Sequence, residues 1–225
     1  MNVTVRYDDN PYWDIQDISV IGTFNKFNWE EGKMRKEGNS WIYETECPPG
    51  EYRYKLLVNG EIQLNDPYNN LFEQDGDDTL WSLIMIDEDG RRLFNPNQYT
   101  VHVSDYTLSP LVTEGEVVKS KKYYNVVADK KVVARFRFQN VTGVHAVTAA
   151  WYAPDGTLFE YAENALCADN EQEEITLWFW LDTQEVMGAG EYGTWSLKLF
   201  VDGEYILEDL FTIESMNRVM RSQLV

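Results

Sequence analysis

The feature that most constrains the fold is a series of short strand-like segments, each closed by turn residues. Asn59-Gly60 and Asp202-Gly203 are two-residue turns that suit antiparallel hairpins, because both positions accept positive φ. Pro154-Asp155-Gly156 is a further turn. The segments between such turns carry apolar runs or apolar–polar alternation. We predict strands at 17–22, 41–45, 52–58, 79–86, 99–103, 132–138, 144–152, 175–181, 194–201 and 205–213.

Regular short strands of this kind predict an all-β chain with two immunoglobulin-like antiparallel β-sandwich domains in tandem. The strand pattern lapses into charged and turn residues between 88 and 98. We therefore predict a first domain at 1–90, a linker at 91–98 and a second domain at 99–214. A helix is expected at most in the C-terminal tail, 215–225.

The net charge of −19 excludes some classes of partner. Binding to nucleic acid requires Lys and Arg to displace counterions from phosphates, yet 38 acidic residues face 19 basic ones. Anionic membrane surfaces are disfavoured for the same reason, and no apolar run approaches the length of a membrane span. A neutral ligand is not repelled, although solubility alone also explains the charge.

The two cysteines, Cys47 and Cys167, fall in different predicted domains. A secreted sandwich often carries a disulfide within one domain, so one thiol per domain favours a reducing compartment. We expect both thiols to remain reduced and the protein to be cytoplasmic. The polar N-terminal residues 1–17, which have no apolar signal core, agree with that expectation.

Five motifs in the first predicted domain occur in an order typical of one known family. They are VIGTFN at 20–25, GNSW at 38–41, PPGEYRYK at 48–55, VNG at 58–60 and NDP at 65–67. Together they resemble the family 48 carbohydrate-binding modules, which include the glycogen-binding domain of AMP-activated kinase β subunits. The resemblance covers about residues 15–87. It implies an early-set immunoglobulin-like sandwich. By itself it does not imply an α-glucan ligand such as glycogen or starch, because many relatives use the fold for docking.

The resemblance also indicates candidate carbohydrate-binding residues. Lys55 matches the family lysine that contacts sugar hydroxyls, and Thr79 matches the threonine of the closing loop. Trp29 is the candidate for the first stacking aromatic, with Phe27 at a competing position. Trp81 stands where the family has Asn, and Ile62 stands where a second platform tryptophan is usual. We predict a site made of Trp29, Lys55, Thr79 and Trp81.

Each of these residues also has a structural interpretation. Trp29 and Trp81 could close the edges of the sandwich while Lys55 is merely solvated. The missing tryptophan at Ile62 favours an adaptor or regulatory module in which the sugar site has decayed. Trp41 is expected in the core, because it shares a strand face with Tyr43.

In the second predicted domain, the segment 175–181 is apolar on both strand faces. Trp178 and Trp180 lie on the face opposite Phe179, which suggests a contact with a protein partner or a homodimer partner. A second ligand platform is the alternative. Trp151 before the Pro154 turn, and the segment 193–195 (GTW), resemble bacterial immunoglobulin-like modules.

Catalysis and metal binding find little support in the sequence. His102 and His145 have no Cys or His companions at metal-ligand spacing. The acidic loop with Asp75, Asp77 and Asp78 lacks the pattern of a calcium-binding EF-hand. No P-loop, dinucleotide fingerprint or nucleophile elbow is present. The sequence therefore predicts a non-catalytic protein without cofactor or metal that binds an α-glucan, with the adaptor as the alternative.

Overall fold

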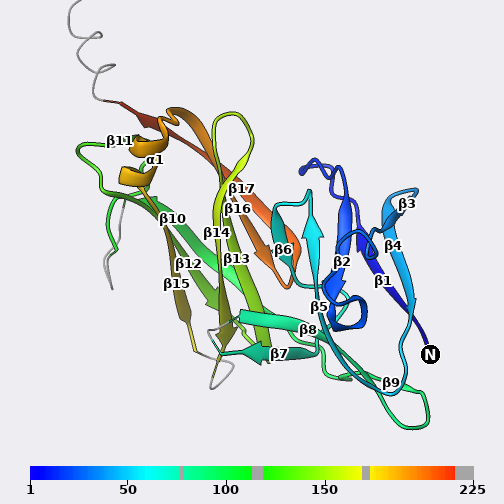
Figure 1. The fold of residues 1–225 in the computed structure, drawn as a ribbon. Helices are drawn as coiled ribbons and strands as arrows, with labels where there is room; N and C mark the ends of the chain where they lie inside the picture. The colour runs from blue at the N-terminus through cyan, green and yellow to red at the C-terminus, as the bar shows by residue number, and fades with distance from the viewer. Residues whose placement is uncertain (77–78, 113–118, 169–172, 216–225) are drawn as a thin grey trace, which may run out of the picture.

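The computed structural model describes residues 1–76, 79–112, 119–168 and 173–215, and strands dominate it (Figure 1). The N-terminal half contains β1 (Asn2–Asp8), β2 (Ile18–Gly22), β3 (Arg35–Glu37), β4 (Ser40–Glu46), β5 (Gly50–Val58), β6 (Ile62–Leu64), β7 (Phe72–Asp75), β8 (Thr79–Ile86) and β9 (Arg92–Leu93). The C-terminal half contains β10 (His102–Ser109), β11 (Tyr123–Asn125), β12 (Lys131–Gln139), β13 (Val144–Tyr152), β14 (Leu158–Cys167), β15 (Ile175–Asp182), β16 (Gly193–Val201) and β17 (Glu204–Glu214). Two short helices complete it, the 3₁₀ helix η1 (Thr23–Asn25) and α1 (Thr183–Ala189).

The strands form two pairs of sheets, which confirms the predicted all-β fold of immunoglobulin-like sandwiches. In the N-terminal half, β1-β4-β3 is one sheet and β2-β5-β8-β7 is the other, with β6 beside β5 and β9 beside β8. In the C-terminal half, β10-β12-β15 faces β11-β17-β16-β13-β14. Among the described strands, β11 and β17 are the parallel pair and the other pairings are antiparallel.

Several local expectations were wrong. The strand expected at 99–103 begins at His102. The strands that were not predicted are β1, β3, β6, β7, β9, β11 and β14, and the helix α1 was not predicted either. Cys167, which lies outside every predicted strand, is the last residue of β14. The predicted linker at 91–98 begins with β9, which pairs with β8 of the first half. The helix expected in the tail falls on 216–225, which lie outside the described ranges.

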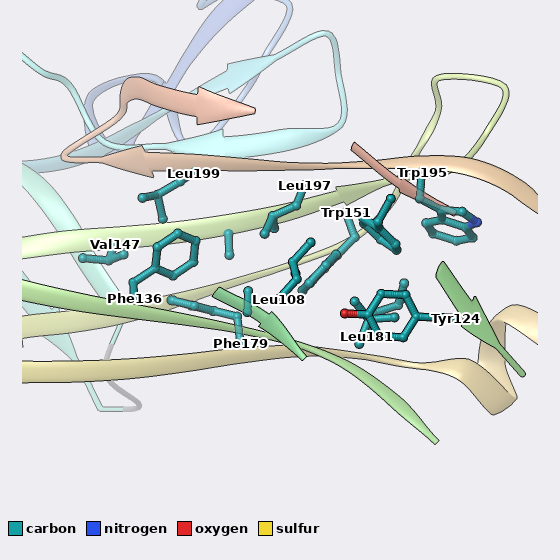
Figure 2. Close-up of a cluster of buried hydrophobic side chains, with 14 of the residues drawn as sticks. Leu108, Tyr124, Phe136, Val147, Trp151, Phe179, Leu181, Trp195, Leu197 and Leu199 are labelled. Atoms are coloured by element: carbon teal, nitrogen blue, oxygen red, sulfur yellow. The ribbon is translucent and has the colours of Figure 1, made fainter. Parts of the chain in front are cut away.

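The core of the C-terminal half lies between its two sheets (Figure 2). Phe136 and Phe179 from one sheet meet Trp151, Leu197 and others from the facing sheet, and all of them are almost fully buried. Burial of large apolar side chains between two sheets is what stabilises a sandwich.

The core of the N-terminal half extends into the C-terminal half. Tyr54 and Trp41 are buried in it, as the alternation of their strands predicts. The same apolar cluster contains Tyr152 and Phe200 of the second half. The ring of Trp13 lies 4.8 Å from that of Phe200, between centroids. A shared apolar cluster means that the two halves pack against each other and are not connected by a flexible linker alone.

The two thiols differ sharply in their surroundings. Cys47 is fully buried, and burial raises the pKa of its thiol, whereas Cys167 is exposed; both are free. Because the thiolate is the reactive form, we expect iodoacetamide to modify one thiol in the native protein and two after denaturation. Intact mass after each treatment checks this. Equal modification of both thiols in native protein would contradict the burial of Cys47.

A buried histidine links the chain segment between the halves to the second sandwich. The Nδ1 of His145 lies 2.6 Å from Asp202 Oδ2, and its Nε2 lies 3.2 and 3.1 Å from the carbonyl oxygens of Thr100 and Thr142. Burial alone would lower the pKa of His145, but the hydrogen bond and charge of Asp202 and the two carbonyls outweigh it and raise that pKa.

The raised pKa of His145 makes the stability of the fold depend on pH. The stabilisation is fully present below the ordinary histidine pKa of 6.5 and is lost as pH rises through the higher pKa of the folded state. Urea unfolding between about pH 5 and 8 is therefore expected to show a downward trend that His145→Gln flattens. His102→Gln, at an exposed histidine, serves as the control. Identical pH slopes for wild type and His145→Gln would contradict this.

Candidate functional site

The candidate site lies on the outer face of the sheet β2-β5-β8-β7. Tyr54 and Leu56 point into the core with no exposed surface. Because side chains alternate along a strand, Arg53 and Lys55 leave the opposite face of β5. Trp81 of β8 lies on that same face, with its ring centroid 5.3 Å from the Arg53 guanidinium and 5.7 Å from the Lys55 ammonium.

The loop after β2 brings a second aromatic ring to Trp81. Phe27 meets Trp81 edge-on, with ring centroids 5.6 Å apart, and Phe27 is 41% exposed. The loop is held by the buried side chain of Asn25, which accepts a hydrogen bond from the Gly22 N–H at 2.9 Å and donates one to the Val20 carbonyl at 2.8 Å. Asn25, the last residue of the motif at 20–25, therefore positions the loop rather than a ligand.

Phe27 adopts an unusual backbone conformation. Its φ is 59°, and that of Lys26 before it is 55°. A bulky residue in this region costs roughly 1–2 kcal/mol and is uncommon. The hydrogen bond from the Phe27 N–H to the Gly22 carbonyl, at 2.8 Å, helps to hold it. Such strain occurs at binding sites more than elsewhere, so it favours a function for the Phe27 ring.

Lys55 is buried by the C-terminal half. Its Nζ lies 2.7 Å from Glu163 Oε2 of β14, and the two side chains are 4% and 6% exposed. The other carboxylate oxygen, Oε1, accepts a hydrogen bond from the Leu80 N–H at 2.9 Å. The Glu163 carboxylate, from the second half, thus binds both Lys55 of β5 and the Leu80 N–H of β8. Lys55 is the residue that matches the family's sugar-contacting lysine.

The structure brings together some of the predicted site residues and not others. Lys55 and Trp81 are neighbours, and Thr79 lies two residues before Trp81 on β8. Trp29, which is 49% exposed, lies under the ammonium of Lys33 at 4.9 Å from its ring centroid. The aromatic that contacts Trp81 is Phe27, the position that competes with Trp29 in the sequence. Ile62, at the position of the second platform, is buried in the core.

The Asn-Asp-Pro motif at 65–67 has a structural role. Asp66 is buried and accepts a hydrogen bond from the Tyr54 hydroxyl at 2.7 Å. Its own N–H donates to Ser82 Oγ at 2.9 Å. Burial raises the pKa of the Asp66 carboxyl. The motif fixes the turn after β6 against the core, so it supports the fold and not ligand contact.

No metal site or membrane span emerges from the described part of the chain. Across 1–76, 79–112, 119–168 and 173–215, His, Cys, Asp and Glu side chains do not gather in threes as a metal ion would require. None of the helices within those ranges is long and apolar enough to cross a membrane. Of the three aspartates in the acidic loop, only Asp75 lies within those ranges, because 77–78 fall outside them. Asp75 forms an ion pair with Arg53 at 3.0 Å.

Residues 12–91 match the family model described as the glycogen recognition site of AMP-activated protein kinase. The resemblance read from the five motifs is therefore confirmed, and carbohydrate binding is the function that it supports. None of the curated proteins compared matches the chain.

Solved structures resemble the chain at low identity. An immunoglobulin-like protein from Pseudomonas aeruginosa is 15% identical, with a TM-score of 0.36, over 51% of this chain and 97% of its own. A β-glucosidase from Listeria innocua is 12% identical, with a TM-score of 0.33, over 55% of this chain and 17% of its own. A maltogenic amylase from S. marinus is 12% identical, with a TM-score of 0.31; 94% of this chain spans 28% of that enzyme.

Proposed function

We propose that this chain is a non-catalytic protein that binds an α-glucan, such as glycogen or starch, through the outer face of the sheet β2-β5-β8-β7. The observation that carries the proposal is the pairing of Phe27 with Trp81 inside the segment that matches the glycogen-recognition family. Aromatic rings cover the apolar face of a sugar, and nearby polar groups bind its hydroxyls. Arg53 and Thr79 supply such groups, and Trp29, 49% exposed, adds a further aromatic ring in the loop after β2.

The environment of Glu163, the carboxylate that pairs with Lys55, supports a non-catalytic role. Glycoside hydrolysis requires two carboxyl groups that are free to exchange protons and to reach the substrate. Glu163 is held instead by Lys55 and by the Leu80 N–H, and its side chain is 6% exposed. It therefore acts as a structural anchor between the halves.

A second function, that of an adaptor, is favoured by two specific observations. Ile62 is buried where the family has its second aromatic platform. Lys55, the sugar-contacting position, is sequestered by Glu163. If the sugar site has decayed, the exposed aromatics serve a protein partner, with Trp178 and Trp180 as a further contact or a homodimer contact. For either function we propose a cytoplasmic location, which the two free thiols support.

Affinity electrophoresis in gels containing glycogen or amylopectin tests the proposal. We expect the wild type to be retarded, and β-cyclodextrin to relieve the retardation. Phe27→Ala and Trp81→Ala are each expected to weaken binding by about 1–3 kcal/mol, because each removes an aromatic surface on which a sugar ring can stack. Trp29→Ala is expected to weaken binding by the same amount if the Trp29 ring also stacks on the sugar.

Phe94→Ala is the matched control, since Phe94 is 70% exposed and lies under Arg92 much as Trp29 lies under Lys33. It is expected to leave the retardation unchanged. Absence of retardation for folded wild-type protein in both polysaccharides would eliminate the glucan proposal and leave the adaptor in its place.

A further inference from the structure

A cleft of about 360 Å³ lies in the C-terminal half, at the open side of its sandwich. The strands β14 and β15 are the end strands of their respective sheets, so the cleft runs between two sheet edges. It is lined by Glu160, Tyr161 and Asn164 from β14 and by Trp178 and Trp180 from β15, with Trp151 beneath. Its size falls within the range of small-molecule sites.

Two residues that line the cleft each carry a buried polar atom without a hydrogen-bond partner among the described residues. These atoms are the Nε1 of Trp178, which can only donate a hydrogen bond, and the Oε1 of Glu160, which accepts one when the carboxyl is ionised. Leaving a buried polar group without a hydrogen bond costs roughly 1–3 kcal/mol. A buried donor and a buried acceptor without partners, on two residues that line one cleft, favour a ligand that offers both an acceptor and a donor.

The surroundings of Glu160 are unfavourable for a negative charge. Burial raises the pKa of its carboxyl, and the negative charges of Glu185 and Asp182 raise it further. A ligand group that donates a hydrogen bond to this carboxyl relieves part of that cost.

The walls of the cleft offer aromatic surface. Trp180 is 51% exposed, and Tyr161 is 37% exposed. The Nζ of Lys131 lies over one face of the Trp180 ring, 4.3 Å from the centroid, in a cation–π contact. Large exposed aromatics beside buried polar groups form an amphipathic site.

We propose that this cleft binds a neutral saccharide, with a sugar hydroxyl donating to Glu160 Oε1, a sugar oxygen accepting from Trp178 Nε1, and the sugar ring packing on Trp180. A hydroxyl group is both donor and acceptor, and a sugar adds an apolar face. An organic cation would suit Glu160, but an alkylammonium group offers no acceptor to the Trp178 N–H. This site does not depend on the function proposed for the N-terminal half, from which it differs in every residue.

Nuclear magnetic resonance of the indole N–H groups tests the proposal in the full chain. Trp178→Phe identifies the Trp178 resonance by removing it. We expect at least one of maltoheptaose, cellohexaose and laminarihexaose to shift this resonance saturably. Glu160→Gln keeps the side-chain shape and is expected to weaken that saccharide by about fivefold or more, and Trp180→Ala by about tenfold. Trp81→Ala, in the other half, is expected to leave the shift intact, which separates this site from the first.

Three outcomes would overturn the proposal. One is that no saccharide shifts the Trp178 resonance while the dispersed indole signals show a folded protein. Another is that choline shifts it and the saccharides do not. The third is self-association in sedimentation velocity that Trp180→Ala abolishes, together with no saccharide effect, because the cleft would then be a contact between two copies of the chain.

Discussion

Replacing Gly203 by alanine is expected to destabilise the protein by about 3 kcal/mol or more. Gly203 has a φ of +85°, and a Cβ built there would overlap the backbone carbonyl of Asn65 in the other half. The Gly203 carbonyl also accepts a hydrogen bond from the Tyr7 hydroxyl at 3.0 Å. Both halves must therefore shift to admit the methyl group.

Gly60→Ala provides the matched control. Gly60 also follows a left-handed residue in a two-residue turn, with a φ of +67°, but nothing lies within 4 Å of a Cβ built there. Its replacement is expected to cost only the conformational strain, about 1 kcal/mol. Urea unfolding of both variants measures the difference. Equal losses would show that the close approach of Gly203 to Asn65 does not hold the halves together.

The ion pair between Lys55 and Glu163 gives the second large effect. Its side chains are almost fully buried, so removing one partner leaves an uncompensated charge and is expected to cost about 3–5 kcal/mol. Lys55→Met and Glu163→Gln make the single changes. The double variant, Lys55→Met with Glu163→Gln, removes both charges, and the glutamine at position 163 would still accept a hydrogen bond from the Leu80 N–H. We therefore expect the double variant to be more stable than either single variant.

Urea unfolding of the four proteins gives the coupling energy directly. Arg35→Met is the comparison, because Arg35 pairs with Glu37 while both side chains remain more than half exposed, and its loss is expected to destabilise the protein far less than the loss of Lys55. If Lys55→Met cost no more than Arg35→Met, the buried pair would not be what joins β5 to β14.

Strand β1 alternates strictly, with Val3, Val5 and Tyr7 buried, yet it was not predicted, so alternation alone does not separate the strands that were found from those that were missed. The alternation around Tyr54 correctly indicates the face from which Lys55 emerges. β14 reads LFEYAENALC, whose Glu, Ala and Asn residues have weak strand preference, so its pattern is not visible locally. The helix α1 has seven residues, too few for a periodic signal, although Asp182 caps it by accepting from the Gln184 N–H.

The candidate site was predictable in its residue types and less so in its geometry. That Phe27 rather than Trp29 meets Trp81 depends on two successive non-glycine residues with positive φ, a conformation that sequence patterns do not indicate. The partner of Lys55 lies 108 residues away along the chain, on a strand whose packing depends on the shared core of the two halves. Such long-range contacts follow from tertiary packing and not from local pattern.

Isothermal titration of soluble maltoheptaose into the purified chain tests the central claim most directly. We expect a saturable heat for the wild type, a clearly weaker affinity for Trp81→Ala, and an unchanged affinity for Phe94→Ala. Absence of binding by a folded wild type, or an affinity that Trp81→Ala and Phe27→Ala leave unchanged, would contradict the proposal that the face of Phe27 and Trp81 recognises an α-glucan.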